Sequence, residues 1–125
     1  MYSQHAVNSY NQHNINIESP EKLIEMLYEG ALRFTSFAKK SIEKNDVEKK
    51  VYWLNKVINI FTELLISLDI KKGGDMALYL NGLYEQQIKF IIEANLSNDT
   101  EKLDIVINVL KGLLEAWKDE TQNNG

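Results

Sequence analysis

The chain of 125 residues contains no cysteine and only one proline. Without cysteine it can form no disulfide, no thiolate metal site and no iron–sulfur cluster, and it has no cysteine nucleophile. This absence favours a reducing compartment, and we expect the cytoplasm. At this length one compact domain is expected, which buries roughly two-thirds of the surface that the unfolded chain exposes.

Basic residues are in the minority, because 14 Lys and Arg stand against 18 Asp and Glu and give a net charge of -4. The lysines look dispersed along the chain, so we expect no nucleic-acid binding, which depends on a clustered positive field. No apolar run reaches the roughly 18 to 20 residues of a membrane span, and the N-terminus resembles no signal sequence. The sequence therefore predicts a soluble protein that does not insert into membranes.

Residues 1–17 contain no charged side chain. Their few larger apolar residues show neither helical nor strand periodicity, and a segment this polar cannot bury enough surface to order itself. We therefore expect residues 1–18 to be a mobile, flexible N-terminal arm. Tyr10 and Val7 have no core of their own to fill within it, which makes Tyr10 the arm residue best suited to anchor a contact.

Four helix starts are indicated by capping patterns. Ser19-Pro20-Glu21 offers a capping hydroxyl, a proline at the first helical position and an acid near the positive end of the helix dipole. Two asparagines precede a glutamate at capping-box spacing, and a glycine pair precedes an aspartate. These starts are Asn45 with Glu48, Asn98 with Glu101, and Gly73-Gly74-Asp75.

The predicted helices cover residues 20–44, 46–69, 75–95 and 99–119, with a bundle domain over 19–120 and a disordered tail at 121–125. Short connectors and the absence of strand patterns predict an all-α, antiparallel, up-and-down four-helix bundle. The core stripe expected on the second helix is Val47, Val51, Leu54, Ile58, Phe61, Leu65 and Leu68. On the third helix it is Met76, Leu80, Leu83, Gln87, Phe90 and Ala94.

The first and fourth helices carry more apolar surface than one core requires. Apolar residues of the first helix spread over roughly 240° of its circumference. Beside its core stripe the fourth helix has a second one, made of Ile105, Val109, Gly112, Leu113 and Ala116. Glycines inside helices cost about 1 kcal/mol each relative to alanine, so Gly30, Gly82 and Gly112 indicate either tight helix contacts or close approach by a partner.

Residue patterns for known helical-bundle chemistry are missing. Both histidines, His5 and His13, lie in the predicted arm, so neither a di-iron Glu-x-x-His pair nor a phosphorelay histidine is available on a helix. No phosphate-binding glycine loop follows a strand, and carboxylates such as Glu25 and Glu63 fall on solvated helix arcs. We therefore expect no catalytic residue, no metal and no cofactor, and a protein that acts by binding.

Several ordered motifs resemble the family of flagellar secretion chaperones for flagellin. They are Tyr10, Ser19-Pro20, Leu23, residues 26–31 (MLYEGA) with Arg33-Phe34, residues 63–69 (ELLISLD), residues 73–77 (GGDMA), Leu80, Leu83-Tyr84 and residues 110–117. The resemblance implies a small helical bundle of the bacterial cytosol, without catalysis or cofactor. It also implies that the bundle binds the disordered C-terminal region of flagellin, prevents premature polymerisation and delivers flagellin to the flagellar export apparatus.

In that family the flagellin tail becomes helical on apolar grooves, and the chaperone's own arm can cover part of this surface when no client is bound. The surplus apolar residues of this chain fit such a role. The candidate client-binding residues are Val7, Tyr10, Ile15, Ile17, Met26, Tyr28, Gly30, Ile105, Val109, Gly112 and Ala116. Two alternatives stay open. One is a self-associating helical bundle adaptor without a flagellin client. The other is an enzyme or ligand-binding bundle, which requires a pocket lined with convergent polar groups, and only Gln87 lies inside a core stripe.

Overall fold

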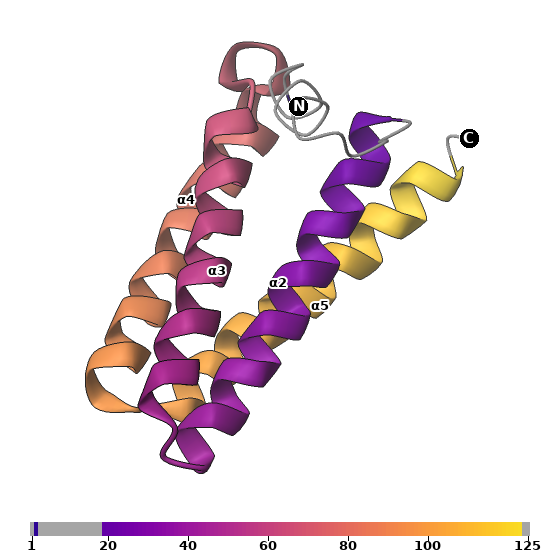
Figure 1. Cartoon of the computed structure of the whole chain (residues 1–125). Helices are drawn as coiled ribbons and strands as arrows, with labels where there is room; N and C mark the ends of the chain where they lie inside the picture. The colour runs from indigo at the N-terminus through magenta and orange to yellow at the C-terminus, as the bar shows by residue number, and fades with distance from the viewer. Residues whose placement is uncertain (1, 3–18, 124–125) are drawn as a thin grey trace.

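The structure, a computed structural model, describes Tyr2 and residues 19–123 and consists of four packed helices (Figure 1). In chain order they are α2 (Pro20–Glu43), α3 (Val47–Ser67), α4 (Ile70–Ser97) and α5 (Thr100–Asn123). Among the described residues there is no strand, and a single isolated antiparallel bridge pairs Tyr2 with Leu68. The predicted all-α helical bundle is confirmed.

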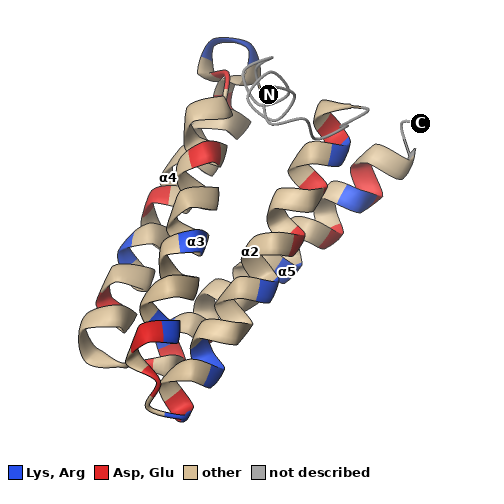
Figure 2. Cartoon of the chain, viewed as in Figure 1, with Lys and Arg blue, Asp and Glu red and all other residues tan. Residues whose placement is uncertain are grey.

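Each helix lies beside the next one along the chain, and α5 closes the bundle by packing on α2. The chain direction alternates from helix to helix in Figure 1. Acidic and basic residues are interspersed on the outside of the helices (Figure 2), and two ion pairs join neighbouring helices to α5: Lys39 with Asp104 at 2.7 Å, and Lys102 with Glu93. Because all four side chains are partly exposed, these pairs contribute little, and apolar packing holds the bundle together.

The helix starts follow the predicted chemistry with two shifts by one residue. Ser19 caps α2 as expected, since its hydroxyl accepts the backbone N–H of Lys22 at 3.1 Å. At α3 the capping residue is Asp46, which accepts from the N–H of Lys49 at 3.2 Å, and Asn45 instead has a φ of 58°. Asparagine tolerates this left-handed conformation, so it ends the preceding helix and leaves the cap to the aspartate after it.

The same shift occurs before α5. Asn98 has a φ of 56° and ends α4, while the Asp99 carboxylate accepts the N–H of Glu101 at 3.0 Å. The predicted capping boxes at Asn45 and Asn98 are therefore wrong, although the helix boundaries they indicated are close to those observed.

Helix α4 begins before its predicted start at residue 75. Asp69 caps it by accepting the N–H of Lys72 at 3.1 Å, and the helix kinks at Gly74, whose φ of 55° and ψ of -135° suit glycine. At the other end of the chain α5 continues to Asn123, so residues 121–123 of the predicted tail are helical. Residues 124 and 125, and the predicted arm apart from Tyr2, lie outside the described residues.

The core draws apolar side chains from all four helices, and α2 contributes the longest buried face. On α3 the predicted stripe is wrong at Val47 and Val51, which are 63% and 37% exposed. Lys50 takes their place on the inner side, because its ammonium donates to the Asn95 carbonyl oxygen at 3.0 Å and to Asn98 Oδ1 at 2.8 Å. A lysine satisfied by two acceptors can be buried where the apolar pattern would place a valine.

Helix α4 departs from its predicted stripe in a similar way. Met76 lies on the outside, and Ala77 and Tyr84 are buried in its place. Gln87 is buried as predicted, but no donor among the described residues reaches its Oε1, where a satisfied amide was the expected arrangement.

Candidate functional site

A pocket between helices holds the side chain of Tyr2. The Tyr2 hydroxyl hydrogen-bonds with that of Tyr28 on α2, at 3.2 Å, and with that of Tyr84 on α4. Its ring meets the indole of Trp117 on α5 edge to face, with centroids 5.9 Å apart and planes at 83°. We call the site formed by Tyr28, Tyr84 and Trp117 the tyrosine pocket; it joins three helices and accepts one aromatic side chain from the N-terminal segment.

The hydroxyls in the tyrosine pocket are neutral. Burial raises the pKa of Tyr2, Tyr28 and Tyr84 above the usual tyrosine value, because a phenolate loses its hydration there. Tyr28 and Tyr84 also hydrogen-bond to each other, so the three hydroxyls form a closed set of polar partners in an apolar surrounding. Next to Tyr2 a cavity of about 160 Å³ is lined by Pro20, Glu21, Ile24 and Trp117.

Helix α5 presents an open apolar face to the outside. Ile105 is 44% exposed, Val109 is half-buried, and Gly112 and Ala116 are exposed. A Cβ built on Gly112 would meet nothing within 4 Å, so packing inside this chain does not explain the glycine. These four residues, which we call the α5 face, recur every three or four positions and therefore line one side of the helix.

The three candidates on α2 differ in position. Met26 lies on the surface, at 42% exposure. Tyr28 is only 1% exposed and is part of the tyrosine pocket, so a client could not reach it while Tyr2 is in place. Gly30 is buried, and a Cβ there would lie 3.4 Å from Ile60 Cδ1 on α3, which favours the tight helix contact as the reason for this glycine.

The remaining candidates belong to the predicted arm. Val7, Tyr10, Ile15 and Ile17 lie outside the described residues, as do both histidines. The structure thus brings together the α5 candidates, separates Met26 from the buried Tyr28 and Gly30, and leaves the arm candidates as predictions.

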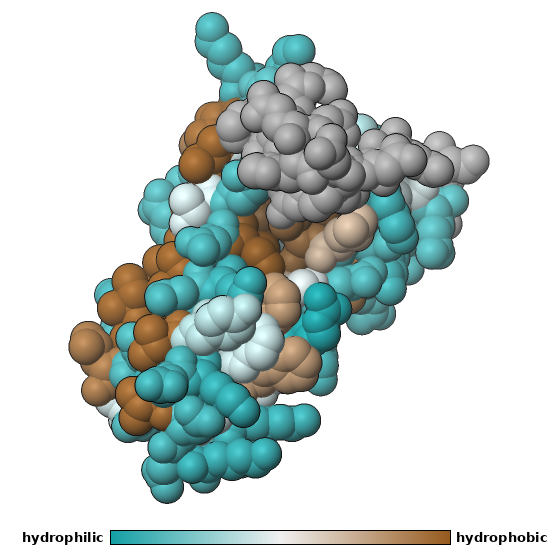
Figure 3. Space-filling view, viewed as in Figure 1, coloured by the Kyte–Doolittle hydropathy of each residue, from teal (hydrophilic) through white to brown (hydrophobic). Residues whose placement is uncertain are grey.

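Two features escaped the sequence interpretation. One is Tyr2, whose pocket partners come from distant parts of the chain; its only signal is a second tyrosine in an uncharged segment. The other is a set of exposed apolar side chains on α4; Figure 3 shows apolar surface over α3 and α4. These residues are Met76, which was predicted for the core stripe, and Leu78, Tyr79, Ile92 and Leu96, whose signal was their position outside that stripe.

Among the described residues, no group of three His, Cys, Asp or Glu is placed to hold a metal ion. None of the helices in this part of the chain is long and apolar enough to cross a membrane. What the arrangement offers is apolar surface and the tyrosine pocket, which suit the binding of a polypeptide.

The fold and these surfaces define an all-helical bundle with an open apolar face. A family model described as flagellar protein FliS matches residues 2–124 of the chain. The chain therefore belongs to the FliS family, which confirms the resemblance read from its motifs.

Named relatives agree with this assignment. A flagellar secretion chaperone FliS from Campylobacter jejuni is 50% identical over 124 residues, which cover 99% of this chain and 96% of the relative. The flagellar secretion chaperone FliS of Salmonella typhimurium is 37% identical over 125 residues, covering 94% and 91% of the two chains. That of Bacillus subtilis is 31% identical over 123 residues, covering 98% and 91%.

Proposed function

We propose that this protein is an export chaperone of the bacterial cytosol that binds the disordered C-terminal region of flagellin. It prevents premature polymerisation of flagellin and delivers it to the flagellar export apparatus. Membership of the FliS family and the names of the relatives, flagellar secretion chaperones, support this role. The role requires no catalytic residue and no cofactor.

The observation that carries the proposal is the α5 face. From Ile105 to Ala116 it extends over roughly 16 Å of helix, at about 1.5 Å per residue, which matches about three turns of a helical client segment. The open space at Gly112 lets a client backbone approach closely. Met26 on α2 and the arm residues Val7, Tyr10, Ile15 and Ile17 are proposed as further client contacts.

The physical mechanism is coupled folding and binding. Ordering a disordered client costs roughly 2 to 5 kcal/mol or more of the gross interaction free energy, so the chaperone must offer a long apolar contact. A single small pocket could not provide it, whereas a helix-length face could. Affinity then depends on buried apolar area and on a few anchoring side chains.

The tyrosine pocket supplies a second contact in this proposal. Tyr2 fills it with one ring and one hydroxyl, and an aromatic client side chain of similar shape could replace it. Tyr28 would then contact the client from the pocket floor. The N-terminal segment and the client would compete for the same place, so the tyrosine pocket stays filled when no flagellin is bound.

Calorimetric titration with a flagellin C-terminal peptide tests the α5 face. Ile105→Asp and Val109→Asp should each weaken binding by about tenfold or more, because each buries a charge against an apolar client. Lys111→Gln is the matched control, since it changes the net charge by the same one unit at an exposed position of the same helix, about 100° or more around the helix from each residue of the face. If all three variants bind the peptide equally well, the α5 face is not the client surface.

The same protein preparation separates this role from a self-associating adaptor. The exposed apolar side chains of α4 and α5 would suit a symmetric dimer as well as a client. Light scattering on the client-free chaperone should report a monomer. A stable dimer that no flagellin peptide dissociates would favour the adaptor instead.

A further inference from the structure

A cluster of aromatic rings lies on the outer side of the contact between α2 and α3, away from α5. Its members are Phe34, Phe37, Tyr52 and Trp53, which we call the aromatic cluster. Phe34 stacks on Trp53 with centroids 5.3 Å apart, Phe37 lies 4.9 Å from the same indole, and Tyr52 meets it edge-on at 4.7 Å. Tyr52 is 54% exposed, and the other three rings are half-buried.

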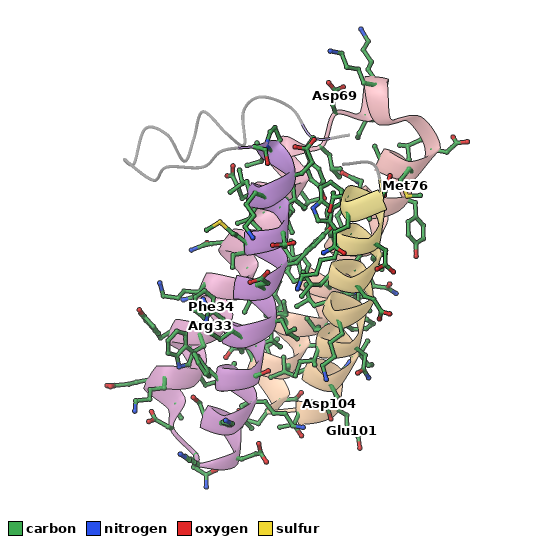
Figure 4. All side chains as sticks on the ribbon, turned by 90° about the vertical axis from the view of Figure 1, so that its right-hand side faces the viewer. Arg33, Phe34, Asp69, Met76, Glu101 and Asp104 are labelled. Atoms are coloured by element: carbon green, nitrogen blue, oxygen red, sulfur yellow. The ribbon has the colours of Figure 1, made fainter. Side chains whose placement is uncertain are left out.

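Cations cover the rings of this cluster. The Arg33 guanidinium carbon lies 5.1 Å from the centroid of Phe34, and Lys56 Nζ lies 5.7 Å from Phe34 and 5.0 Å from Tyr52. Figure 4 shows Arg33 and Phe34 on one side of the molecule, far from the acidic Glu101 and Asp104 of α5. Within the part of the chain that the structure describes, no carboxylate forms an ion pair with Arg33 or Lys56.

Beside the cluster the surface is hollowed. A cavity of about 290 Å³, open to the outside, has Phe37 and Trp53 as its apolar wall and Lys40, Lys44 and Lys49 at its rim, together with Ser41 and Asp46. Asp46 is the sole carboxylate of this lining. One of its oxygens accepts the N–H of Lys49, because it caps α3, and the other lies 4.0 Å from Lys49 Nζ. The rim is therefore cationic over an apolar wall.

The negative net charge of the whole chain hides a local excess of positive charge around this rim. Residues 33–56 contain seven of the 14 basic residues and three of the 18 acidic ones, a net charge of +4, whereas the other residues together carry -8. The lysines are thus not evenly dispersed, contrary to the expectation from the sequence. Since salt screens charges beyond about 8 Å at physiological ionic strength, a small ligand at the cavity responds to the local charge and not to the total.

Helix electrostatics explain only part of this excess. Lys40 and Lys44 lie at the C-terminal end of α2, where cations are favourable next to free carbonyl groups. Lys49 lies in the first turn of α3, where the helix dipole disfavours a cation. Its ammonium lies 4.0 Å from Asp46, but three lysines at the rim exceed this one carboxylate, which leaves net positive charge for an external anion.

We propose that the aromatic cluster and its lysine rim form a second binding surface, which accepts an acidic polypeptide segment carrying one large apolar side chain. The apolar side chain enters the hollow against Phe37 and Trp53, and neighbouring carboxylates face Lys40, Lys44 and Lys49. Complementary charge of this kind selects the partner and speeds its association, while the buried anchor sets the lifetime of the complex. The partner is a protein segment distinct from the one on the α5 face.

The cluster favours a polypeptide over a nucleic acid for two reasons. Phe34 and Trp53 already stack on each other, and Arg33 and Lys56 lie over the Phe34 ring, so these ring faces are occupied and unavailable for base stacking. A nucleic acid long enough to reach beyond the lysine rim would also meet the net negative remainder of the chain.

The test follows the two tryptophans of the isotope-labelled full-length chain by nuclear magnetic resonance. Their indole N–H signals report on the two surfaces separately, because Trp53 belongs to the aromatic cluster and Trp117 to the tyrosine pocket. The probe is a short peptide of glutamates around one phenylalanine, and the control peptide has glutamine in place of each glutamate. Only the acidic peptide should shift the Trp53 signal, and the Trp117 signal should stay in place.

Matched charge reversals sharpen the test. Lys40→Glu combined with Lys44→Glu should lower the affinity for the acidic peptide by roughly threefold to thirtyfold, as expected for two exposed charge pairs. Lys71→Glu with Lys72→Glu makes the same change in net charge in the first turn of α4, at the opposite end of the molecule (Figure 2), and should leave the affinity unchanged. Tyr52→Ala, at an exposed ring, should weaken binding without unfolding the protein.

Three results would overturn the proposal. The first is an unmoved Trp53 signal at saturating acidic peptide. The second is an equal loss of affinity in both double-lysine variants, which would indicate a response to total charge alone. The third is a short oligothymidylate that binds the same surface more tightly than the peptide, which would assign the lysine rim to nucleic acid.

Discussion

The indole N–H of Trp117 donates a hydrogen bond to the backbone carbonyl oxygen of Glu21 at 2.8 Å. This bond joins the C-terminal part of α5 to the first turn of α2, two segments that are distant in the sequence. The same indole contacts the ring of Tyr2 and, at a centroid distance of 6.4 Å, that of Tyr28. Trp117 therefore supports both the closure of the bundle and the wall of the tyrosine pocket.

Replacing Trp117 by phenylalanine should lower the free energy of unfolding by at least about 0.5 to 1.5 kcal/mol, because a ring remains but the N–H donor is lost. Urea unfolding followed by circular dichroism measures the change. Glu21→Asp is the control: the acceptor is a backbone carbonyl, and the acid near the helix N-terminus is kept, so stability should change little. A loss in Glu21→Asp as large as in Trp117→Phe would argue against the hydrogen bond as the cause.

Stability should fall as the pH rises above about 10, the pKa of a tyrosine in the unfolded chain. Burial raises the pKa of Tyr2, Tyr28 and Tyr84 in the folded state, so the unfolded state releases these protons first. The contribution of the three tyrosines to the free energy of unfolding is complete below the pKa of tyrosine in the unfolded chain and is lost as the pH rises above it. Urea unfolding at mildly and strongly alkaline pH measures it. Tyr84→Phe should lose less stability between the two conditions, and an unchanged difference would contradict this assignment.

The two left-handed asparagines should respond differently to glycine. Asn45→Gly should leave stability within a few tenths of a kcal/mol, whereas Asn45→Ala should cost about 1 kcal/mol, because glycine tolerates a φ near 58° as asparagine does and alanine does not. Asn98→Gly should cost about 1 to 3 kcal/mol despite the favourable backbone, since it removes the Oδ1 acceptor of the buried Lys50. Thermal unfolding of the three variants decides this, and equal effects of the two glycine substitutions would speak against a structural role for the Lys50 contact.

Gln87→Leu should raise the free energy of unfolding by about 1 kcal/mol, because an amide oxygen that no described donor reaches is replaced by an apolar side chain of similar size. Chemical denaturation measures the difference. Gln86→Leu, one position along α4 and exposed, serves as the control and should change stability by less than about 0.5 kcal/mol. If Gln87→Leu is the less stable of the two, the amide has a partner that matters.

Local chemistry made part of this fold predictable from the sequence. Ser19 followed by Pro20 predicted a single start for α2, because the capping hydroxyl and the fixed φ of proline both place the first helical residue at position 20. At the α3 start two candidate caps, Asn45 and Asp46, are adjacent, and the choice depends on which of them takes the left-handed conformation. That conformation is set by the geometry of the turn, which spacing alone does not reveal.

Long-range contacts account for what the sequence could not show. Val47 was assigned to the core because the helical period places it there, but Lys50 is buried instead, since its two acceptors come from the end of α4. The tyrosine pocket is beyond sequence analysis for the same reason: it exists only where α2, α4 and α5 meet. The α5 face was predictable, because the helical period places Ile105 and Val109 outside the core stripe of this helix.

Helix α2 begins at the same end of the bundle at which α5 ends (Figure 1). Joining these two ends with a linker and opening the chain at Asn45 would give a circular permutant that retains all four helices and the contacts between them. In such a permutant the segment that carries Tyr2 would become a loop tethered on both sides. Occupation of the tyrosine pocket would then depend on loop-closure entropy and no longer on the freedom of a chain end.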